Sequence, residues 1–514
     1  MPATGEKSPL DAEFDQLVTD ILETWKIPGL SIAVVHGAHT HFKAYGLAEF
    51  PDKKMTTDAL FPAASTTKAF TSAATSMVIK DSKETESPID WDTPISSLIP
   101  DDFVLANDYL TTHTTLEDAL SHRTGQPGHN WMLSYTPEDA TLKDLVRSLR
   151  HLPVSFPPRT HFQYTNNMFV AVTHALQEKT GIPLGKFLKQ RIWEPLSMNE
   201  TFLGVPEAQS NPSIAKKIAE GYTWTPNSED GSYFQEGRPS WGANTGAGAI
   251  VSSVLDYSKW IRELIEKSGP LKGHDSLIKP RTFHFEEGDV NLPSPHHAYA
   301  LGWFVDNYRG QNLYHHTGSW PGYGSLVGFL PDKQFGFVMM GNSASARSGT
   351  MRLAVHLIDK LLGPSNDPLL NERMTACFNR QIEERENMMK DLQRSTADVK
   401  KRLFPRLPDP PIPHSLDLEE YAGMYTHPAN ASVTIKFEGG ELVTEKTQGA
   451  IPGVLGLTHA SGEFFVGRMK SFNLVIEPFV VEFRIDSTGS VTKVGMDLEP
   501  SLKGEKIWFE RCEA

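Results

Sequence analysis

Cysteine is scarce in this chain. Its 514 residues include only Cys377 and Cys512, which are far apart in the sequence. Two distant thiols argue against a disulfide framework and against a cysteine-based metal site. The histidines point to no metal site either, because His113, His122 and His129 lack the short spacings at which zinc ligands usually occur. We therefore expect no metal ion and no cofactor.

An excess of positive charge is also missing. Lys and Arg together number 49 against 63 Asp and Glu, which gives a formal net charge of −14. A protein that binds nucleic acid would show a basic patch, so we expect no nucleic-acid partner.

Long hydrophobic runs are absent as well. No stretch approaches the ~18 apolar residues of a membrane span. The N-terminus lacks the basic region, apolar run and small-residue cleavage site of a signal peptide. Residues 10–25 instead have the periodicity of an amphipathic helix. We therefore expect a cytoplasmic protein with no membrane partner, and the sequence leaves its oligomeric state open.

The composition is that of a large globular protein. Hydrophobic residues make up 39% and charged residues 22% of the chain, and its length predicts two or three domains. Five prolines between residues 405 and 413 indicate a stiff linker, and a charged helix is expected before it over 371–395. We predict a first domain over residues 1–365, a helical linker over 366–413 and a second domain over 414–514.

The first domain is predicted to be α+β. Residues 30–35 and 39–46 read as a hairpin, and a mostly helical stretch follows. Further strands are expected over 299–306, 313–316, 325–330 and 335–341. This order predicts an antiparallel sheet flanked by helices, together with an all-helical subdomain.

The second domain has a different pattern. Short strands are predicted over 431–437, 441–446, 463–466, 479–485, 490–497 and 506–510. Closely spaced short strands with turns between them predict a small antiparallel β-barrel.

A serine opens the most informative helix of the sequence. Ser65 precedes apolar pairs that recur every four residues, as on one buried helix face: Ala69 and Phe70, Ala73 and Ala74, Met77 and Val78. Such a serine is ordinarily a helix cap. Lys68, however, lies one turn away on the same face, and an adjacent amine can take the proton of a hydroxyl nucleophile.

The Ser-x-x-Lys spacing is a weak signal by itself. It recurs at Ser213–Lys216, Ser276–Lys279 and Ser490–Lys493. Two further motifs must decide whether Ser65 is a nucleophile.

The second motif is Tyr164-x-Asn166, which occurs once in the chain. It precedes a helix expected from Met168 to about Thr180, with Asn166 or Asn167 as a plausible cap. Without other support, the pattern is more typical of a helix cap beside a packing tyrosine.

The third motif has two candidates. Lys179-Thr180-Gly181 ends the helix just described, and its glycine is expected to terminate that helix. His316-Thr317-Gly318 follows a predicted strand and is succeeded by Gly322 and Gly324. Glycines near a strand edge let a substrate approach the backbone, so we choose His316-Thr317-Gly318.

Taken in order, Ser65-x-x-Lys68, Tyr164-x-Asn166 and His316-Thr317-Gly318 resemble the serine beta-lactamase class C family, which also holds D-alanyl-D-alanine carboxypeptidases, D-aminopeptidases, esterases and acyltransferases. The resemblance covers roughly residues 10–362. It extends to the segments 27–35, 120–125, 299–303 and 341–343. The C-terminal strands resemble, more weakly, the lipocalin-like barrel often appended to such enzymes.

The resemblance implies a role for each matching residue. Ser65 would be the nucleophile, and Lys68 and Tyr164 would share the general-base role. Asn166 would bind Lys68 and the substrate amide. His316, Thr317 and Gly318 would line the site, and the backbone N–H groups of Ser65 and Ser319 would form the oxyanion hole.

This chain departs from the family pattern in two places. His316 stands where a lysine is usual, and a neutral imidazole binds a carboxylate less strongly than an ammonium does. Ser319-Trp320-Pro321 replaces smaller residues. With Trp224 and Trp241, Trp320 is consistent with a hydrophobic substrate or with plain packing.

We expect a serine hydrolase that cleaves an ester, thioester or amide of a small molecule through an acyl-serine. The alternatives left open are an acyltransferase of natural-product biosynthesis, a D-amino-acid peptidase and a beta-lactamase. A non-catalytic binding protein is disfavoured because Ser65 and Lys68 are both present.

Overall fold

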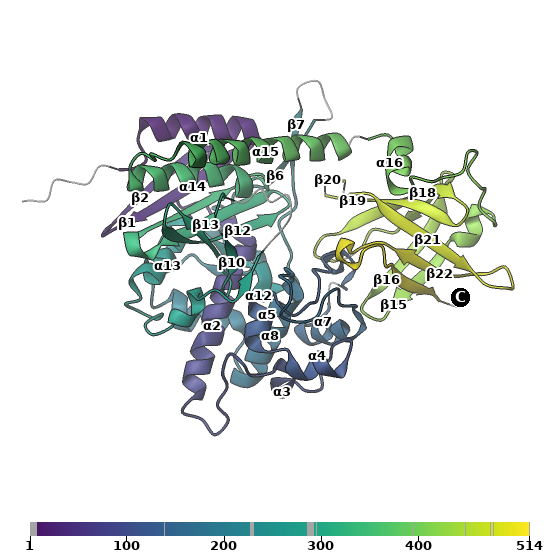
Figure 1. Ribbon diagram of the computed structural model, residues 1–514, viewed down its shortest axis with the longest axis horizontal. Helices are drawn as coiled ribbons and strands as arrows, with labels where there is room; N and C mark the ends of the chain where they lie inside the picture. Colours follow the sequence, from purple (N-terminus) through teal and green to yellow (C-terminus); the bar gives the residue numbers. More distant parts are fainter. Residues whose placement is uncertain are drawn as a thin grey trace, which may run out of the picture.

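Two antiparallel β-structures dominate the computed structural model, one in each half of Figure 1. The structure describes residues 8–137, 139–226, 231–284, 292–294, 296–392, 394–447, 449–472, 474–475 and 477–512. The larger structure is a nine-stranded sheet in the order β3-β2-β1-β14-β13-β12-β11-β10-β9. Its strands are β1 (Gly29–His36), β2 (His39–Glu49), β3 (Lys53–Lys54), β9 (Thr282–Phe283), β10 (His297–Tyr299), β11 (Phe304–Tyr308), β12 (Gln311–Trp320), β13 (Tyr323–Leu330) and β14 (Phe335–Gly341).

The centre of this sheet joins the two ends of the first domain. β1 pairs with β2 as the predicted hairpin and with β14 on its other side, where Ile32 faces Met339. Seven of the eight residues of β1 are buried, because helices cover both faces of the sheet. A strand buried on both faces needs a continuous apolar run, which the sequence supplies over 30–35.

Helices from both ends of the first domain cover one face. α1 (Ala12–Trp25) begins after Asp11, whose side chain accepts a hydrogen bond from the backbone of Phe14. It packs on α14 (Ala346–Leu362), and their apolar residues form one core with β1, β13 and β14. α15 (Pro368–Leu392) lies along this layer and extends toward α16 (Thr396–Leu403) beside the second domain (Figure 1).

The other face is covered by α13 (Val254–Glu266) and by the helical subdomain. The helical subdomain and the antiparallel sheet together confirm the predicted α+β class with an all-helical region. Its helices are α2 (Thr67–Ser82), α3 (Ile95–Leu98), α4 (Asp108–His113), α5 (Leu116–Leu120), α6 (Met132–Tyr135), α7 (Leu142–Ser148), α8 (Asn166–Thr180), α9 (Leu184–Leu188) and α12 (Thr245–Gly248).

α2 lies deeper than its sequence pattern predicts. The apolar pairs indicate one buried face, yet the polar positions between them, such as Thr71 and Ser72, are buried too. The helix is enclosed because α8, α9 and α12 pack around it on the side away from the sheet. Thr71 donates to the Gly246 carbonyl, whereas the buried Ser72 hydroxyl has no hydrogen-bond partner among the described residues.

The strand predicted over 299–306 is wrong. The structure has two strands there, β10 and β11, separated by a turn in which Gly302 has φ +83°. Leu301 and Trp303 are buried because this turn packs against α2, not because they alternate along a strand. A Cβ on Gly302 would lie 2.8 Å from the Ala69 nitrogen, so the turn depends on glycine.

The C-terminal structure is a closed barrel of eight antiparallel strands. Strands follow one another around the ring, and β15 closes it against β23. They are β15 (Gly423–His427), β16 (Asn430–Glu438), β17 (Glu441–Thr444), β18 (Gly453–Ser461), β19 (Phe464–Ser471), β21 (Phe479–Ile485), β22 (Val491–Met496) and β23 (Ile507–Arg511), with β20 (Leu474–Val475) pairing outside the ring.

The barrel confirms the predicted architecture but has two strands that the sequence pattern missed, β15 and β18. β18 contains Gly453 and Gly456, which lower its intrinsic strand preference. Pairing with β17 and β19 compensates for this weakness. Alternate residues of the strands are buried and fill the interior: Val433 and Ile435, Leu455 and Leu457, Val481 and Phe483, Val494 and Met496.

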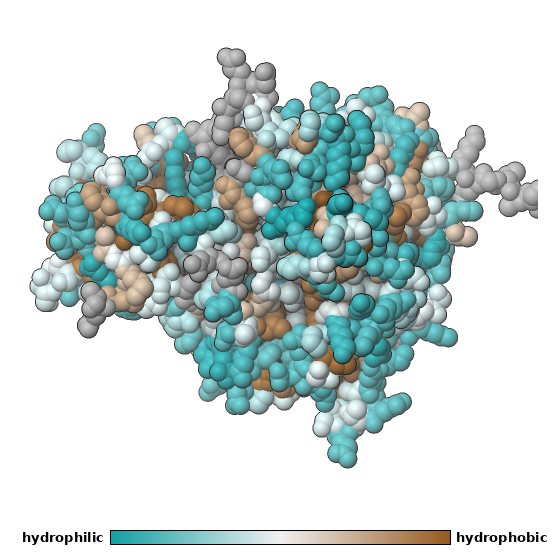
Figure 2. Space-filling view, turned by 180° about the vertical axis from the view of Figure 1, so that it is seen from behind, coloured by the Kyte–Doolittle hydropathy of each residue, from teal (hydrophilic) through white to brown (hydrophobic). Residues whose placement is uncertain are grey.

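The molecular surface is mixed in character. On the face in Figure 2, hydrophobic residues occur in small groups among polar ones. Most large apolar side chains are instead used in the cores. Among the described residues, no helix has the length and hydrophobicity that crossing a bilayer requires.

Candidate active site

Ser65 lies in a short 3₁₀ turn, Ala64–Thr66, that leads into α2. It is not a helix cap, because the turn places it one residue before Thr66, the residue at the cap position. Ala64 has φ +50°, a left-handed conformation that costs a non-glycine residue roughly 1 kcal/mol or more. This turn leaves the Ser65 side chain half-buried, within reach of a substrate.

Lys68 is fully buried beneath Ser65. Its Nζ atom lies 3.1 Å from Ser65 Oγ and donates to Asn166 Oδ1 at 2.7 Å and to the Ala247 carbonyl at 2.8 Å. Three helices therefore meet at one nitrogen: α2 carries the lysine, α8 the asparagine and α12 the carbonyl.

Burial lowers the pKa of Lys68 well below its usual range, because an ammonium loses its hydration inside the protein. A neutral amine has two N–H donors and one lone pair. The two donors match the Asn166 and Ala247 oxygens, which can only accept. When Lys68 is neutral, its lone pair faces Ser65 Oγ 3.1 Å away, and in that form the lysine can take the serine proton.

Tyr164 reaches the same hydroxyl from the turn before α8. Its phenol hydrogen-bonds with Ser65, and its ring centre is 4.8 Å from Lys68 Nζ. Burial raises the pKa of Tyr164, while the bond from Ser65 and the charge of Arg347 act in the opposite direction. His122 supports this turn: its Nδ1 accepts a hydrogen bond from the Thr165 backbone at 3.1 Å.

Asn166 is the first residue of α8, so the predicted role of Asn166 or Asn167 as helix cap is wrong; Thr165 holds that position. The Asn166 side chain is therefore free for the site. Its Oδ1 accepts from Lys68, and its Nδ2 donates to Asn130 Oδ1 at 3.1 Å.

His316 lies within β12, facing the site from the sheet. Tyr299 donates its hydroxyl to His316 Nε2 at 2.9 Å, because the imidazole Nδ1 donates to the Thr317 carbonyl at 2.6 Å. Both ring nitrogens are thus bonded inside the protein. Burial lowers the pKa of His316 to about 3, so the imidazole is neutral at physiological pH.

The rest of the third motif lies along the same strand, β12. β11 pairs with β12 no further than His315, and the strand continues alongside the turn that carries Ser65. A Cβ on Gly318 would lie 2.2 Å from the Ala63 carbonyl oxygen, so glycine permits this close approach. Thr317 and Ser319 alternate with the buried residues and are half-buried.

The rejected triplet ends a helix, as predicted. Gly181 has φ +68° and follows the last turn of α8, where its N–H donates to the Gln177 carbonyl. Lys179 donates to the Ser87 carbonyl at 2.8 Å, on the exposed side of that helix.

Two of the three tryptophans singled out in the sequence meet each other. The rings of Trp241 and Trp320 are 4.2 Å apart, and both side chains are buried. Trp224 lies elsewhere: its ring centre is 5.8 Å from Lys26 Nζ and 5.7 Å from the Arg385 guanidinium carbon.

Four residues of the site were not identified from the sequence: Asn130, Ala247, Tyr299 and Arg347. Ala247 contributes a backbone carbonyl, which has no side-chain signal. Arg347 acts on Tyr164 through its charge and comes from the start of α14, almost two hundred residues along the chain. Of these four residues, only Tyr299 lies in a segment, 299–303, whose sequence resembles the family.

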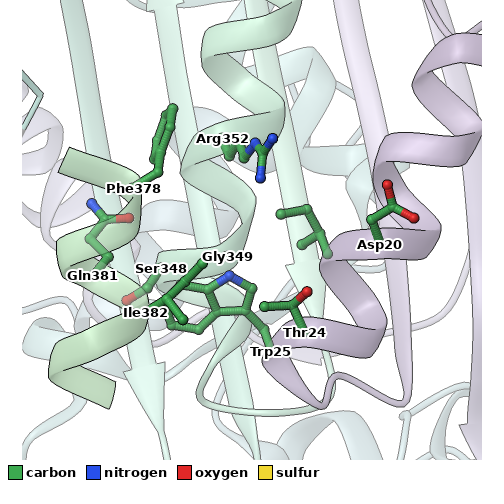
Figure 3. A pocket seen from close by; sticks show the side chains of 10 residues that line it. Asp20, Thr24, Trp25, Ser348, Gly349, Arg352, Phe378, Gln381 and Ile382 are labelled. Carbon is green, nitrogen blue, oxygen red and sulfur yellow. The ribbon is translucent and has the colours of Figure 1, made fainter. Parts of the chain in front are cut away.

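A small cavity lies on the opposite face of the sheet and is separate from these residues. Trp25, Gly349, Arg352 and Phe378 line it between α1, α14 and α15 (Figure 3). Its apolar walls belong to the core of that face, whereas Ala63 and Ala64 beside Ser65 belong to the other core.

Comparison with known proteins agrees with this geometry. A family model described as Beta-lactamase matches residues 14–359, and one described as Domain of unknown function (DUF3471) matches residues 407–511. Unguisins hydrolase ungD' from Aspergillus campestris (strain IBT 28561) is 34% identical over 512 residues, which cover 98% of this chain and 92% of that protein.

Solved structures share the fold. The octameric penicillin-binding protein homologue from Pyrococcus abyssi has a TM-score of 0.59 at 18% identity and covers 96% of this chain and 99% of its own. D-amino acid amidase from Ochrobactrum anthropi SV3 has a TM-score of 0.54 at 22% identity, and the match covers 68% of this chain and 99% of the amidase chain. Because the Beta-lactamase family model matches most of the chain and the unguisins hydrolase is 34% identical over nearly all of it, this chain belongs to the beta-lactamase family and is a serine hydrolase.

Proposed function

We propose that Ser65 is the nucleophile of this hydrolase. One observation carries the proposal: the buried Lys68 Nζ lies 3.1 Å from Ser65 Oγ and is held in place by two oxygens that can only accept, those of Asn166 and Ala247. Oγ attacks the substrate carbonyl carbon, and its proton passes to Lys68 Nζ, with the Tyr164 phenol sharing the proton.

The remaining roles follow from the same arrangement. The backbone N–H groups of Ser65 and Ser319 stabilise the oxyanion of the tetrahedral intermediate. As the intermediate collapses, Tyr164 delivers a proton to the departing amine or alcohol. Water then attacks the acyl-serine and releases the acid, and Ser65 recovers its proton. Asn166 holds Lys68, and Thr317 and Gly318 line the site beside the neutral His316.

The substrate class is a small molecule with an amide or ester bond. Two relatives support this choice by name, an unguisins hydrolase over the whole chain and a D-amino acid amidase over the first part. We propose an unguisin as the first compound to test. The neutral His316 supports a substrate bound without a carboxylate at the third motif.

We further propose domain limits of 1–365, 366–413 and 414–514, supported by the separate sheets and by the helices α15 and α16 between them. The barrel would be lipocalin-like, since its eight strands follow one another around the ring. Its packed interior argues for a supporting role rather than for ligand storage.

A labelling experiment tests the nucleophile. A fluorophosphonate probe followed by peptide mass spectrometry should give an adduct on Ser65. Ser65→Ala should lose the adduct and at least a thousandfold in kcat/KM toward nitrophenyl esters, D-amino acid amides or an unguisin, consistent with loss of the covalent step. Ser276→Ala is the matched control, since Ser276 has the same spacing to Lys279. An adduct on another residue, or activity retained by Ser65→Ala, would refute the proposal.

A further inference from the structure

The barrel forms hydrogen bonds and ring contacts with residues 129–135 of the first domain. Gly449 donates its N–H to the Ser134 carbonyl at 3.2 Å, and Ile451 donates to the Leu133 carbonyl at 2.9 Å. A Cβ on Gly449 would lie 2.3 Å from that Leu133 oxygen, so the two backbones touch directly. The ring of Phe509, buried in the barrel, lies 6.1 Å from the ring of Tyr135.

A buried carboxylate of the barrel domain makes a third hydrogen bond to this segment. Glu499 follows β22, and its Oε2 accepts the backbone N–H of His129 at 2.8 Å. His129 has φ +44°, a conformation that costs a non-glycine residue roughly 1 kcal/mol or more. A hydrogen bond to a carboxylate is stronger than a neutral one, so Glu499 offsets this strain. The His129 ring is held as well, because Nε2 lies 3.0 Å from the Pro153 carbonyl.

The residue after this strained turn reaches the active site. Asn130 is exposed, and its Oδ1 accepts from Asn166 Nδ2 at 3.1 Å. The other end of the same amide, Asn166 Oδ1, accepts from Lys68 Nζ at 2.7 Å. A side-chain amide presents oxygen on one side and NH₂ on the other. Asn130 Oδ1 accepts from the NH₂ end of the Asn166 amide, and this bond therefore fixes the orientation in which the Asn166 oxygen points to Lys68.

These contacts form one path from the barrel to the catalytic amine. We propose that the C-terminal barrel is part of the active site: Glu499 holds the turn at His129, and this turn places Asn130 so that it orients the Asn166 amide toward Lys68. Asn130 and Glu499 are positioning residues in this scheme. The inference rests on the proposed function, because it requires that Lys68 accepts the proton of Ser65.

The first test uses Asn130→Ala in the full-length chain. Asn130 is exposed, so this change should affect folding by no more than ~0.5 kcal/mol. A misplaced catalytic group costs up to roughly a hundredfold, and we expect kcat/KM with a nitrophenyl ester to fall ten- to hundredfold. Without a fixed oxygen at Asn166 the charged form of Lys68 loses an acceptor, so the acidic limb of the kcat/KM profile should move to lower pH.

The second test reaches the same site from the barrel. Glu499→Ala should lower kcat/KM and shift the acidic limb in the same direction as Asn130→Ala. Glu499→Gln keeps an oxygen acceptor for His129 and should restore most of the lost activity. Glu463→Ala is the matched control, because Glu463 accepts from Ser415 and Tyr421, which both belong to the C-terminal domain. This control should lower the unfolding temperature and leave kcat/KM at 25 °C within twofold of wild type.

Two results would overturn the inference. One is wild-type kcat/KM and an unshifted acidic limb in Asn130→Ala. The other is that Glu499→Ala and Glu463→Ala, if they have the same unfolding temperature, lose the same amount of activity. Ser65 labelling separates this failure from failure of the proposed function: normal labelling of Ser65 in every variant leaves the nucleophile in place, whereas labelling elsewhere removes the proposed function itself.

Discussion

Replacing Lys68 by methionine separates catalysis from stability at a single buried position. Methionine has a similar length and no amine, so the proton acceptor of Ser65 is lost while the space stays filled. General-base catalysis contributes roughly 10²–10⁴ in rate, or ~3–5 kcal/mol of transition-state free energy. We therefore expect kcat/KM of Lys68→Met to fall by about three orders of magnitude.

Stability should respond far less to the same change. The substitution leaves the Ala247 carbonyl and Asn166 Oδ1 without their donor, at roughly 1–3 kcal/mol each. It also removes a buried amine, whose desolvation cost offsets much of this loss. Each kcal/mol shifts Tm by about 2–4 °C in a domain of about 150–250 residues and by less in a larger one, so we expect a change of a few degrees at most.

The assay combines nitrophenyl ester turnover, acyl-enzyme detection by mass spectrometry and thermal unfolding. The matched control is Lys179→Met, since Lys179 bonds the Ser87 carbonyl on the exposed side of α8. It should keep wild-type kcat/KM. A folded Lys68→Met that retains kcat/KM within tenfold of wild type would refute the assignment of Lys68 as proton acceptor.

Two further predictions concern β12. Gly318→Ala should lower kcat/KM at least tenfold and the free energy of unfolding by ~1–3 kcal/mol, because the new Cβ meets the Ala63 carbonyl oxygen at 2.2 Å. The control is Gly456→Ala, where a new Cβ would have its nearest neighbour atom at 3.9 Å. Both variants are compared by urea unfolding and ester turnover, and equal effects in the two would contradict the packing argument. His316 has a folded-state pKa of about 3, below its usual 6.5, so the unfolded state binds the extra proton between these values and stability falls as pH falls through that window. Urea unfolding at pH 6.5 and at about pH 4.5 should show wild type losing about 2 kcal/mol more than His316→Gln, and parallel losses would contradict a neutral buried imidazole.

Local patterns in the sequence determined most of the fold. The continuous apolar run over 30–35 predicts a strand buried on both faces, and β1 is such a strand. Gly181 predicts the end of α8 and thereby excludes the competing triplet. These features depend on hydrophobic periodicity and backbone conformation, which neighbouring residues fix.

The contacts of the site depend on the tertiary structure. Ser65 and Lys68 are one turn apart, so the sequence could pair them, and the family resemblance added Tyr164, Asn166 and His316. Nothing local indicated that the Ala247 carbonyl would take a donor of Lys68, or that Tyr299 and Thr317 would occupy both nitrogens of His316. The link from Glu499 to His129 joins residues 370 positions apart. Burial sets the pKa of Lys68 and His316, and burial is decided by how distant elements pack rather than by the residues beside them.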